Sequence, residues 1–430
     1  MHWQSPIIMP VAGIDVSKEF SDFCILTPDN TVFSRGKIFH HPASMDKLCK
    51  QLTMAEQAFE KKPICIMEST AYYHRILYRY LTNHGYKVIV INPLQSKAAA
   101  DFNIRSVKTD KVDAYKLALL YGKKNLKPSM VLSQTIQELR DLCRNRNSLN
   151  EQLVVVEERL RANIEQTLPG FVKAFSRLRS KSGLVLLSNY ASKAELNEAG
   201  VEKIAEIINK TSKMGKSWSE SKAQMILTGV NNNQEYISSP SHSAIIKSIA
   251  ITVLAILDAI TETDNALESL FEQNEQLMTD RALLMSIPGI GKQIAAALIG
   301  ETGSFENFKN YRQLSAFYGL DQKVNQSGKG RRTGLGISKK GSSLARKMLR
   351  MAVQNSVYAT KKGEPANPVL AGYFQAKANE KAPKVAETAV MRKLTAIIFA
   401  VMRDRKPFEL RTPEEHISIM GIDTSKRISA

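Results

Sequence analysis

Two acidic residues stand where apolar strands are predicted, and an acid in such a place needs a partner. Asp15 interrupts the apolar segment 11–16, whose pattern predicts a buried strand. Glu68 follows the apolar run 64–67, so it stands at the carboxyl end of a second predicted strand. Open α/β sheets bind their ligands at that end of their strands. Both positions therefore favour a chemical role over a purely structural one.

Two further acids follow on a predicted helix. Asp110 and Asp113 are three residues apart, so they share one helix face, and Leu117 directs that face toward the core. Taken singly, Asp110 is an ordinary N-cap, Asp113 a partner of the helix dipole and Glu68 a strand-end charge. Taken together, the acids predict a site for Mg²⁺, with Mn²⁺ as the alternative, because these hard cations prefer oxygen ligands and clamp phosphodiesters. The sequence has no His cluster or Cys pair at the spacing of a softer metal.

The composition indicates a nucleic-acid partner. The chain has 430 residues, enough for two or three domains, and 60 Lys and Arg against 41 Asp and Glu give a formal charge of +19. Because the excess is spread over folded segments, it predicts a polyanion rather than a membrane surface, without separating DNA from RNA. The four cysteines lack metal spacing and are expected as buried free thiols. With no secretion signal and no run of about 18 uncharged apolar residues, we expect a cytoplasmic protein.

The first 125 residues alternate strand and helix patterns. Three leading strands with short links and then a β-α-β-α order predict a mixed sheet with helices on its faces. The ribonuclease H-like fold requires this order of elements, with one acid on the first strand, another on the fourth strand and the last on a late helix. The predicted strands are 11–16, 23–26, 31–38, 64–68 and 88–91, and the predicted helices are about 44–59, 75–84 and a segment ending at 121.

From residue 136 the pattern becomes helical. The residues at the 4-3-4 spacing of a coiled-coil seam are Leu149, Leu153, Val156, Leu160 and either Asn163 or Ile164. Two interpretations stay open: a long helix packed within its own domain, or a coiled coil that joins two subunits. Residues 171–240 are polar, with loops expected at 210–221 and 231–233, and show no chemistry. A second helix over 243–278 is too apolar for one narrow stripe and is expected to be buried between neighbours.

A glycine turn links two apolar helix patterns near residue 290. The segment Pro288-Gly289-Ile290-Gly291-Lys292 resembles a helix-hairpin-helix. Its glycines let the backbone approach a phosphate, and the start of the following helix offers unpaired N–H groups to an anion. Such a hairpin grips phosphates without reading sequence. The alternative is a plain turn between two helices.

A basic segment comes next. Residues 323–350 contain no acid and nine basic residues, at positions 323, 329, 331, 332, 339, 340, 346, 347 and 350. One interpretation is a basic loop that only holds the nucleic-acid backbone. The other is a nucleophile, because Ser327 lies between Gln326 and Gly328 ahead of a cluster of cations. A serine attacking phosphorus needs such cations to stabilise the charge that builds on the phosphoryl oxygens. Ser338 is the competing candidate.

Jointly these motifs resemble the DEDD transposases of insertion-sequence family one-ten. The matching segments, between about residues 11 and 403, are Gly13-Ile14-Asp15-Val16-Ser17-Lys18, the Glu68 segment, Lys108-Thr109-Asp110-Lys111-Val112-Asp113-Ala114, Pro288-Gly289-Ile290-Gly291, Gln326-Ser327-Gly328 and Ile337-Ser338-Lys339-Lys340-Gly341. The resemblance implies a RuvC-like domain over 1–128, a helical coiled-coil linker or dimerisation region over 129–278, a mainly helical transposase domain over 279–410 and a tail over 411–430.

The resemblance also implies roles for the site residues. The four acids, Asp15, Glu68, Asp110 and Asp113, would bind Mg²⁺, and Ser327 would form a covalent phosphoserine link to a cut strand. Such a link keeps the phosphodiester energy for rejoining, which fits the absence of a P-loop. The acids and Ser327 are over two hundred residues apart, so they must meet within one subunit or between subunits. The residues expected to contact nucleic acid are Gly289, Gly291, Lys292, Lys329, Arg331, Arg332, Lys339 and Lys340.

The partners implied by the resemblance are target and donor DNA and a structured noncoding guide RNA, often called a bridge RNA, that pairs with both. It further implies a dimer or tetramer of this chain, associated with the nucleoid of a bacterial or archaeal cell. Two other functions stay open. One is a metal-dependent nuclease of the Holliday-junction-resolvase kind, in which the acids cut by water and the basic loop only binds. The other is a non-enzymatic nucleic-acid-binding protein with a degenerate sheet.

Overall fold

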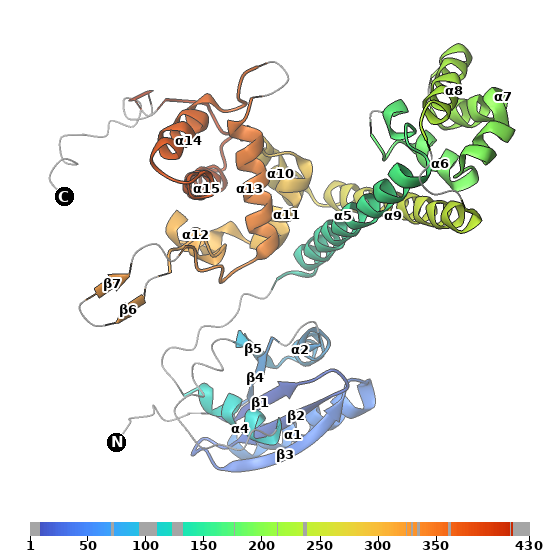
Figure 1. The fold of residues 1–430 in the computed structure, drawn as a ribbon. Helices are drawn as coiled ribbons and strands as arrows, with labels where there is room; N and C mark the ends of the chain where they lie inside the picture. Colours follow the sequence, from blue (N-terminus) through green and yellow to red (C-terminus); the bar gives the residue numbers. More distant parts are fainter. Residues whose placement is uncertain are drawn as a thin grey trace. The chain divides into compact units, whose positions relative to one another are not determined.

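A computed structural model gives the fold of the chain (Figure 1). It describes residues 9–69, 73–93, 110–122, 132–175, 177–212, 214–234, 239–323, 325–327, 330–332, 336–359, 363–412 and 414–415, and of 110–112, 325–327 and 330–332 only the backbone. The chain forms two compact units, Met1–Val131 and Leu132–Ala430. The boundary falls close to the predicted end of the first domain at residue 128. The further division of the second unit at residue 278 stays a prediction.

The first unit is built on a five-stranded mixed sheet in the order β3-β2-β1-β4-β5. The central strand β1 pairs antiparallel with β2 and parallel with β4, and β5 extends the parallel part. The mixed ribonuclease H-like sheet expected from the sequence is therefore confirmed. The strands are β1 (Val11–Val16), β2 (Phe20–Leu26), β3 (Val32–Phe39), β4 (Ile64–Glu68) and β5 (Lys87–Ile91).

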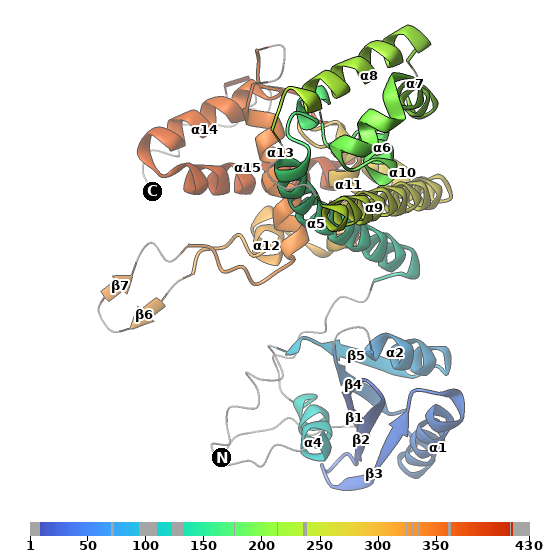
Figure 2. The ribbon, with the colours of Figure 1, turned by 45° about the vertical axis from the view of Figure 1, so that its right-hand side comes forward.

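Helices lie on both faces of this sheet (Figure 2). Helices α1 (Pro42–Phe59) and α2 (His74–Asn83) cover one face, and α4 (Asp110–Leu120) covers the other. Each face has its own apolar core because successive strand residues point to opposite sides. The core under α1 and α2 includes Ile14, Leu48, Met67 and Leu77, and the core under α4 includes Ile66, Ile91, Ala114 and Leu117.

The cysteines are free, as the sequence predicts. Cys24, Cys65 and Cys143 are buried and Cys49 is half-buried. Burial raises the pKa of Cys65, and it raises the pKa of Cys143 to about 12. Because a thiolate is the reactive form, these buried thiols are poor nucleophiles and metal ligands at neutral pH.

The second unit contains two long antiparallel helices, α5 (Gln134–Thr167) and α9 (Pro240–Glu272). Arg146 on α5 donates two hydrogen bonds to the Asp264 carboxylate on α9, at 2.5 and 3.1 Å. The interpretation of a long helix packed within its own chain is thus confirmed, whereas a subunit-joining role stays a prediction. Of the predicted seam, Leu153, Leu160 and Ile164 are buried, and Val156 packs at the edge of the same core.

The segment 171–240 is mostly helical, with a turn at the predicted loop 231–233 and a linker before residue 216 that is shorter than the predicted loop 210–221. Helices α6 (Lys181–Asn189), α7 (Lys193–Thr211) and α8 (Lys216–Asn231) fill this segment. Two of them begin at serines, because Ser180 and Ser192 accept a hydrogen bond from a backbone N–H in the first turn. The first loop was predicted too long because polar residues at the start of α8 look like loop residues and are here an exposed helix face.

Helix α9 is also less buried than predicted. One face packs on α5 and the short helices, while Ile251 is 56% exposed and Ile245 is 42% exposed. Among the described helices, α9 is the one that is long and apolar enough to cross a membrane by length and composition. That signal is weak, because a core helix passes the same test and α9 lies along α5.

The remainder of the second unit is a helical domain with one small hairpin. Its core joins the last helices to the start of α5 and the end of α9, through side chains such as Leu139 and Phe271. The elements are α10 (Glu275–Met285), α11 (Lys292–Thr302), α12 (Tyr311–Phe317), β6 (Asn325–Ser327), β7 (Gly330–Arg332), α13 (Ser343–Val357), α14 (Pro368–Glu380) and α15 (Pro383–Asp404).

Candidate active site

Asp15 and Glu68 lie side by side at the ends of two neighbouring parallel strands. In the β1–β4 register, Ile14 pairs with Met67, so the next residue on each strand is an acid. Both acids are half-buried. By strand alternation their side chains share the sheet face that carries α4, the face of Val11 and Ile66. The structure therefore brings together the first two acids predicted from the sequence.

A close helix approach directs the other two acids to the same end. A Cβ atom at Gly13 would lie under 3.0 Å from the backbone of Ala114 and Ala118, so α4 runs directly over β1. Near the other end of α4, the Tyr121 hydroxyl lies 3.9 Å from the sulfur of Met9, which precedes β1. Helix α4 thus runs antiparallel to β1, and its first turn lies toward Asp15. That turn is where Asp110 and Asp113 stand.

The described part of the predicted metal set comprises Asp15, Glu68 and Asp113. Asp113 is half-buried and lies 3.6 Å from the ammonium of Lys116. The backbone of Asp110 begins α4, and its side chain lies outside the described residues. Among the side chains that the structure describes, no three His, Cys, Asp or Glu residues are arranged to hold a metal ion. The all-oxygen donor set on one face nevertheless fits a hard divalent cation in its chemistry.

The predicted nucleophile belongs to a small β-hairpin. Strands β6 and β7 pair antiparallel, and Ser327 pairs with Gly330 as the last pair before the turn. Ser327 therefore stands at the tip of the hairpin, and Arg331 follows on the returning strand. Lys329 lies outside the described residues, as do the side chains of Ser327, Arg331 and Arg332.

The competing serine lies at the base of this hairpin. Gln322 and Ile337 form an isolated bridge there, and the Ser338 hydroxyl donates a 2.5 Å hydrogen bond to the Asp321 carboxylate. Ser338 Oγ also accepts a hydrogen bond from the backbone N–H of Lys340 at 3.3 Å. Ser338 thus fastens the two ends of the hairpin. Asp321, which sequence reasoning missed, is its partner, and only the fold brings the two together.

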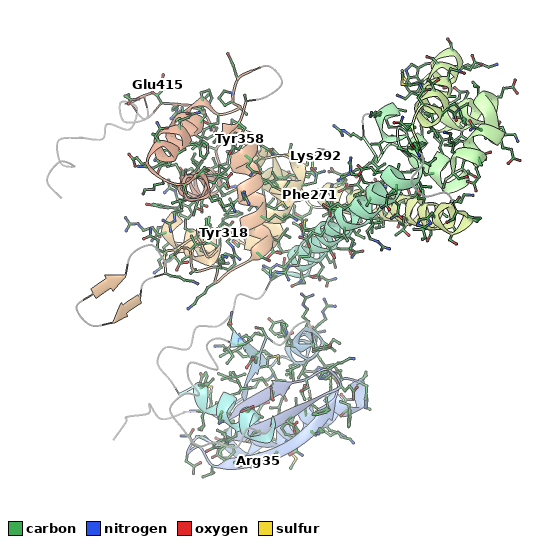
Figure 3. The ribbon with its side chains drawn as sticks, in the orientation of Figure 1. Arg35, Phe271, Lys292, Tyr318, Tyr358 and Glu415 are labelled. Atoms are coloured by element: carbon green, nitrogen blue, oxygen red, sulfur yellow. The ribbon has the colours of Figure 1, made fainter. Side chains whose placement is uncertain are left out.

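Basic side chains anchor the same base to the helical core. Arg346 donates to the backbone oxygens of Tyr318 and Gly341 at 3.0 and 2.9 Å, and Arg392 donates to the oxygen of Leu320 at 2.8 Å. Tyr318 is fully buried, so these contacts tie the hairpin to rigid structure (Figure 3). The predicted nucleic-acid contacts Lys339 and Lys340 are exposed beside this base.

A short glycine turn joins α10 and α11 where a helix-hairpin-helix or a plain turn is predicted, and its two glycines differ. Gly289 has φ +94°, and a Cβ atom there would collide with Ser356 and Ala352 of α13, so this glycine serves helix packing. Gly291 has open space around it and caps the start of α11. Lys292 is exposed there, 3.5 Å from a Glu268 oxygen (Figure 3). Gly291 and Lys292 thus stay accessible for the predicted phosphate contact.

Two family models match the chain. Residues 12–169 match the model of the DEDD transposases of IS110, described as a transposase, and residues 281–367 match the model described as the transposase IS116/IS110/IS902 family. The chain is a transposase by class, an enzyme that cuts and rejoins DNA. It belongs to the IS110 family.

Two similar proteins match most of the chain, and two further matches cover smaller parts of it. A pilin gene-inverting protein of Moraxella lacunata is 24% identical over 94% of this chain and 98% of its own length. The insertion element IS110 43.6 kDa protein of Streptomyces coelicolor is 23% identical over 88% of this chain and 95% of its own length. The transposase of element IS1111A from Coxiella burnetii is 35% identical over 21% of this chain and 24% of its own length. A solved structure of Thermus thermophilus RuvC covers 28% of this chain and all of its own, with 14% identity and a TM-score of 0.22.

Proposed function

We propose that this transposase cuts and rejoins target and donor DNA through two chemical groups: a Mg²⁺-dependent site of four acids and a serine that links covalently to DNA. A noncoding guide RNA pairs with both DNA partners and selects them. The observation that carries the metal site is the register of β1 and β4, which sets Asp15 beside Glu68 at the strand ends under the first turn of α4. The same acids are candidates for Mn²⁺, which takes similar ligands.

The proposed chemistry needs no external energy source. The Ser327 hydroxyl attacks the phosphorus of a DNA phosphodiester, and an Oγ–P bond forms as the bond from phosphorus to one sugar oxygen breaks. The proton lost by the hydroxyl is balanced by the proton gained by the departing sugar oxygen. A hydroxyl of the second strand then reverses the step and rejoins the DNA. The metal ions, when bound, would supply positive charge that polarises the phosphate.

The hairpin suits a nucleophile because it presents Ser327 at a tip whose base is fixed. The Asp321–Ser338 hydrogen bond and the contacts of Arg346 and Arg392 hold that base. A well-held nucleophile gains rate because the entropy of positioning is lost before the reaction starts. The position of Ser327 at the tip favours it as the attacking group, whereas Ser338, whose proton the Asp321 carboxylate can accept, stays the competing nucleophile at the base.

Ser327→Ala, with Ser338→Ala as the matched control, tests the serine. We expect Ser327→Ala to lose all covalent protein–DNA product on a denaturing gel, and Ser338→Ala to keep it at a reduced rate. If Ser327→Ala still cleaves DNA, the alternative function applies, a metal-dependent structure-specific nuclease without serine chemistry. If Ser338→Ala alone loses the covalent product, the nucleophile is misassigned.

The proposal also requires the acids and Ser327 to act on the same strand, within one chain or between copies in a dimer or tetramer. Mixing inactive Asp15→Ala with inactive Ser327→Ala separates these cases. Regained activity in the mixture demonstrates shared sites between subunits, and continued inactivity favours sites within one chain.

Guidance by RNA has its own test. The purified chain is freed of nucleic acid and then mixed with specific and unrelated DNA, with and without the noncoding RNA encoded beside its gene. We expect a specific complex only when the RNA is present. The same specific complex without RNA would refute guidance while leaving the cutting chemistry intact.

A further inference from the structure

A fifth acid stands in the same row as the predicted metal ligands. In the antiparallel pairing of β1 with β2, Asp15 lies directly opposite Asp22. Directly opposite residues on neighbouring strands point to the same face, so Asp22 shares the α4 side of the sheet with Asp15 and Glu68. Its neighbours on that face of β2, Cys24 and Leu26, belong to the core under α4. Glu68, Asp15 and Asp22 thus form a row across three neighbouring strands of the sheet, β4, β1 and β2.

Asp22 is buried, and its carboxylate has no partner among the residues that the structure describes. The residue is only 4% exposed, and no group in the described part of the chain makes a hydrogen bond or ion pair with its carboxylate. Lys37 is its partner in the β2–β3 register, but the Lys37 ammonium lies 3.6 Å from the centre of the Phe20 ring instead. A buried carboxylate without a partner is costly, and a like charge directly across the strand adds to the cost.

A bound cation would remove both costs at once. Side chains directly opposite in an antiparallel pair have Cβ atoms about 4.5–5.5 Å apart. Two carboxylates at that spacing can converge on one hard cation, whose oxygen ligands lie at about 2.0–2.6 Å. The cation would neutralise the repulsion between Asp15 and Asp22 and give the buried Asp22 a partner.

We propose that Asp22 is a fifth carboxylate of the divalent-cation site, acting beside Asp15 on the β2 side of the row. This inference rests on the proposed function, because the cation is the one assigned there to the four acids. It extends the site from the strand ends of β1 and β4 across to β2. Asp22 escapes a search by sequence spacing because it follows Asp15 by only seven residues and looks like the polar start of a strand.

The test measures cation binding rather than catalysis. Mn²⁺ is titrated into the metal-free full-length protein by calorimetry, and the metal-free melting temperature is recorded beside it. The variants are Asp22→Asn and Asp22→Ser, with Asp15→Asn as the reference. Asp46→Asn is the matched control, because Asp46 is an exposed acid on α1, on the opposite face of the sheet.

We expect both Asp22 variants to bind Mn²⁺ about tenfold or more weakly, as losing a supporting carboxylate does in metal sites. Asp46→Asn should bind like the wild type. The metal-free melting temperature of Asp22→Asn should be unchanged or higher, because the repulsion across the strand is gone. Mn²⁺ affinity within about twofold of the wild type in both Asp22 variants would overturn the inference.

The other outcomes separate this inference from the proposed function. If Asp15→Asn loses Mn²⁺ binding and the Asp22 variants keep it, the predicted metal site stands and Asp22 is not part of it. If the wild type itself binds no Mn²⁺, the proposed metal site fails and Asp22 fails with it. If both Asp22 variants are unfolded in metal-free buffer by circular dichroism, Asp22 has a structural role and the inference is wrong.

Discussion

The close packing of α4 on β1 makes Gly13→Ala a sensitive test of how the acids are positioned. The added Cβ would lie under 3.0 Å from the carbonyl oxygen of Ala114 and the nitrogen of Ala118, both backbone atoms. Real Cβ atoms essentially never come that close, and a helix backbone cannot swing aside as a side chain can. Helix α4 must therefore move away from the sheet, and the turn that carries Asp113 moves with it.

The magnitude follows from overpacking. Inserting a methyl group into a packed core costs about 1–3 kcal/mol, and the upper end applies here because both obstacles are backbone. A loss of about 3 kcal/mol lowers amide protection about 150-fold, since about 1.4 kcal/mol corresponds to a factor of ten. Hydrogen exchange on the full-length protein should show this loss in β1 and α4. Mn²⁺ affinity should fall as well, because the acids no longer converge.

Gly36→Ala is the matched control on the other side of the sheet. Its added Cβ would meet the ring of Phe23 at 2.7 and 2.8 Å, a side chain that can shift. We expect β3 to lose some protection, and α4 and Mn²⁺ binding to stay as in the wild type. If Gly13→Ala leaves β1 and α4 protected within about threefold of the wild type, the helix does not lie on Gly13 and the proposed convergence of the acids is wrong.

Three further predictions concern the second unit. Gly289→Ala should destabilise the packing of α13 on the α10–α11 turn by about 3 kcal/mol in urea unfolding, because Gly289 has φ +94° and an added Cβ would collide with α13. Gly291→Asp should fold normally and should weaken binding to all DNA sequences alike in filter-binding assays. Arg144→Ala should lower the hydrogen-exchange protection of α11 by about 2 kcal/mol, because it removes two hydrogen bonds from the buried Glu301 carboxylate. Lys347→Ala is the control, because it removes an exposed ion pair with Glu151 and should leave this protection unchanged. Burial raises the pKa of Glu195, but hydrogen bonds from Lys247, the Ala191 N–H and Ser243 outweigh burial and lower the pKa. The stability that the Glu195 carboxylate contributes is therefore full above pH 4.5 and is lost as the pH falls through the lowered pKa. Glu195→Gln should flatten this acid dependence of the melting temperature in thermal melts.

The strand pattern of the first unit was predictable, and the packing of its helix was not. Apolar runs located β1, β2 and β4, because a strand buried on both faces leaves a strong apolar signal, and the partly exposed β3 and β5 were located as well. The spacing of apolar residues in a helix shows which of its sides is apolar, but it does not show which element packs on that side. That α4 lies on β1 depends on Gly13, and a glycine in a strand has several meanings in sequence alone.

The helices of the segment 171–240 were not predicted, for a related reason. Helices α6, α7 and α8 are polar outside and each buries only a few residues. Their apolar side chains complete a core that α5 and α9 supply from segments distant in sequence. Short helices of this kind draw their stability from tertiary packing, so the local pattern carries little of the signal.

Asp15 could be found from the sequence because it lies two residues after Gly13 on one strand, whereas Asp22 lies on another strand and could not. Gly13 and Asp15 share one face of β1, yet the first must lack a side chain and the second must have one. The structure gives the reason: α4 presses its backbone on Gly13, and its first turn lies toward Asp15. The short motif Gly13-Ile14-Asp15 therefore contains both the residue on which α4 packs and the first predicted metal ligand. Asp22 reaches the same row through pairing with another strand, and pairing partners are set by register, which no spacing within one strand can record.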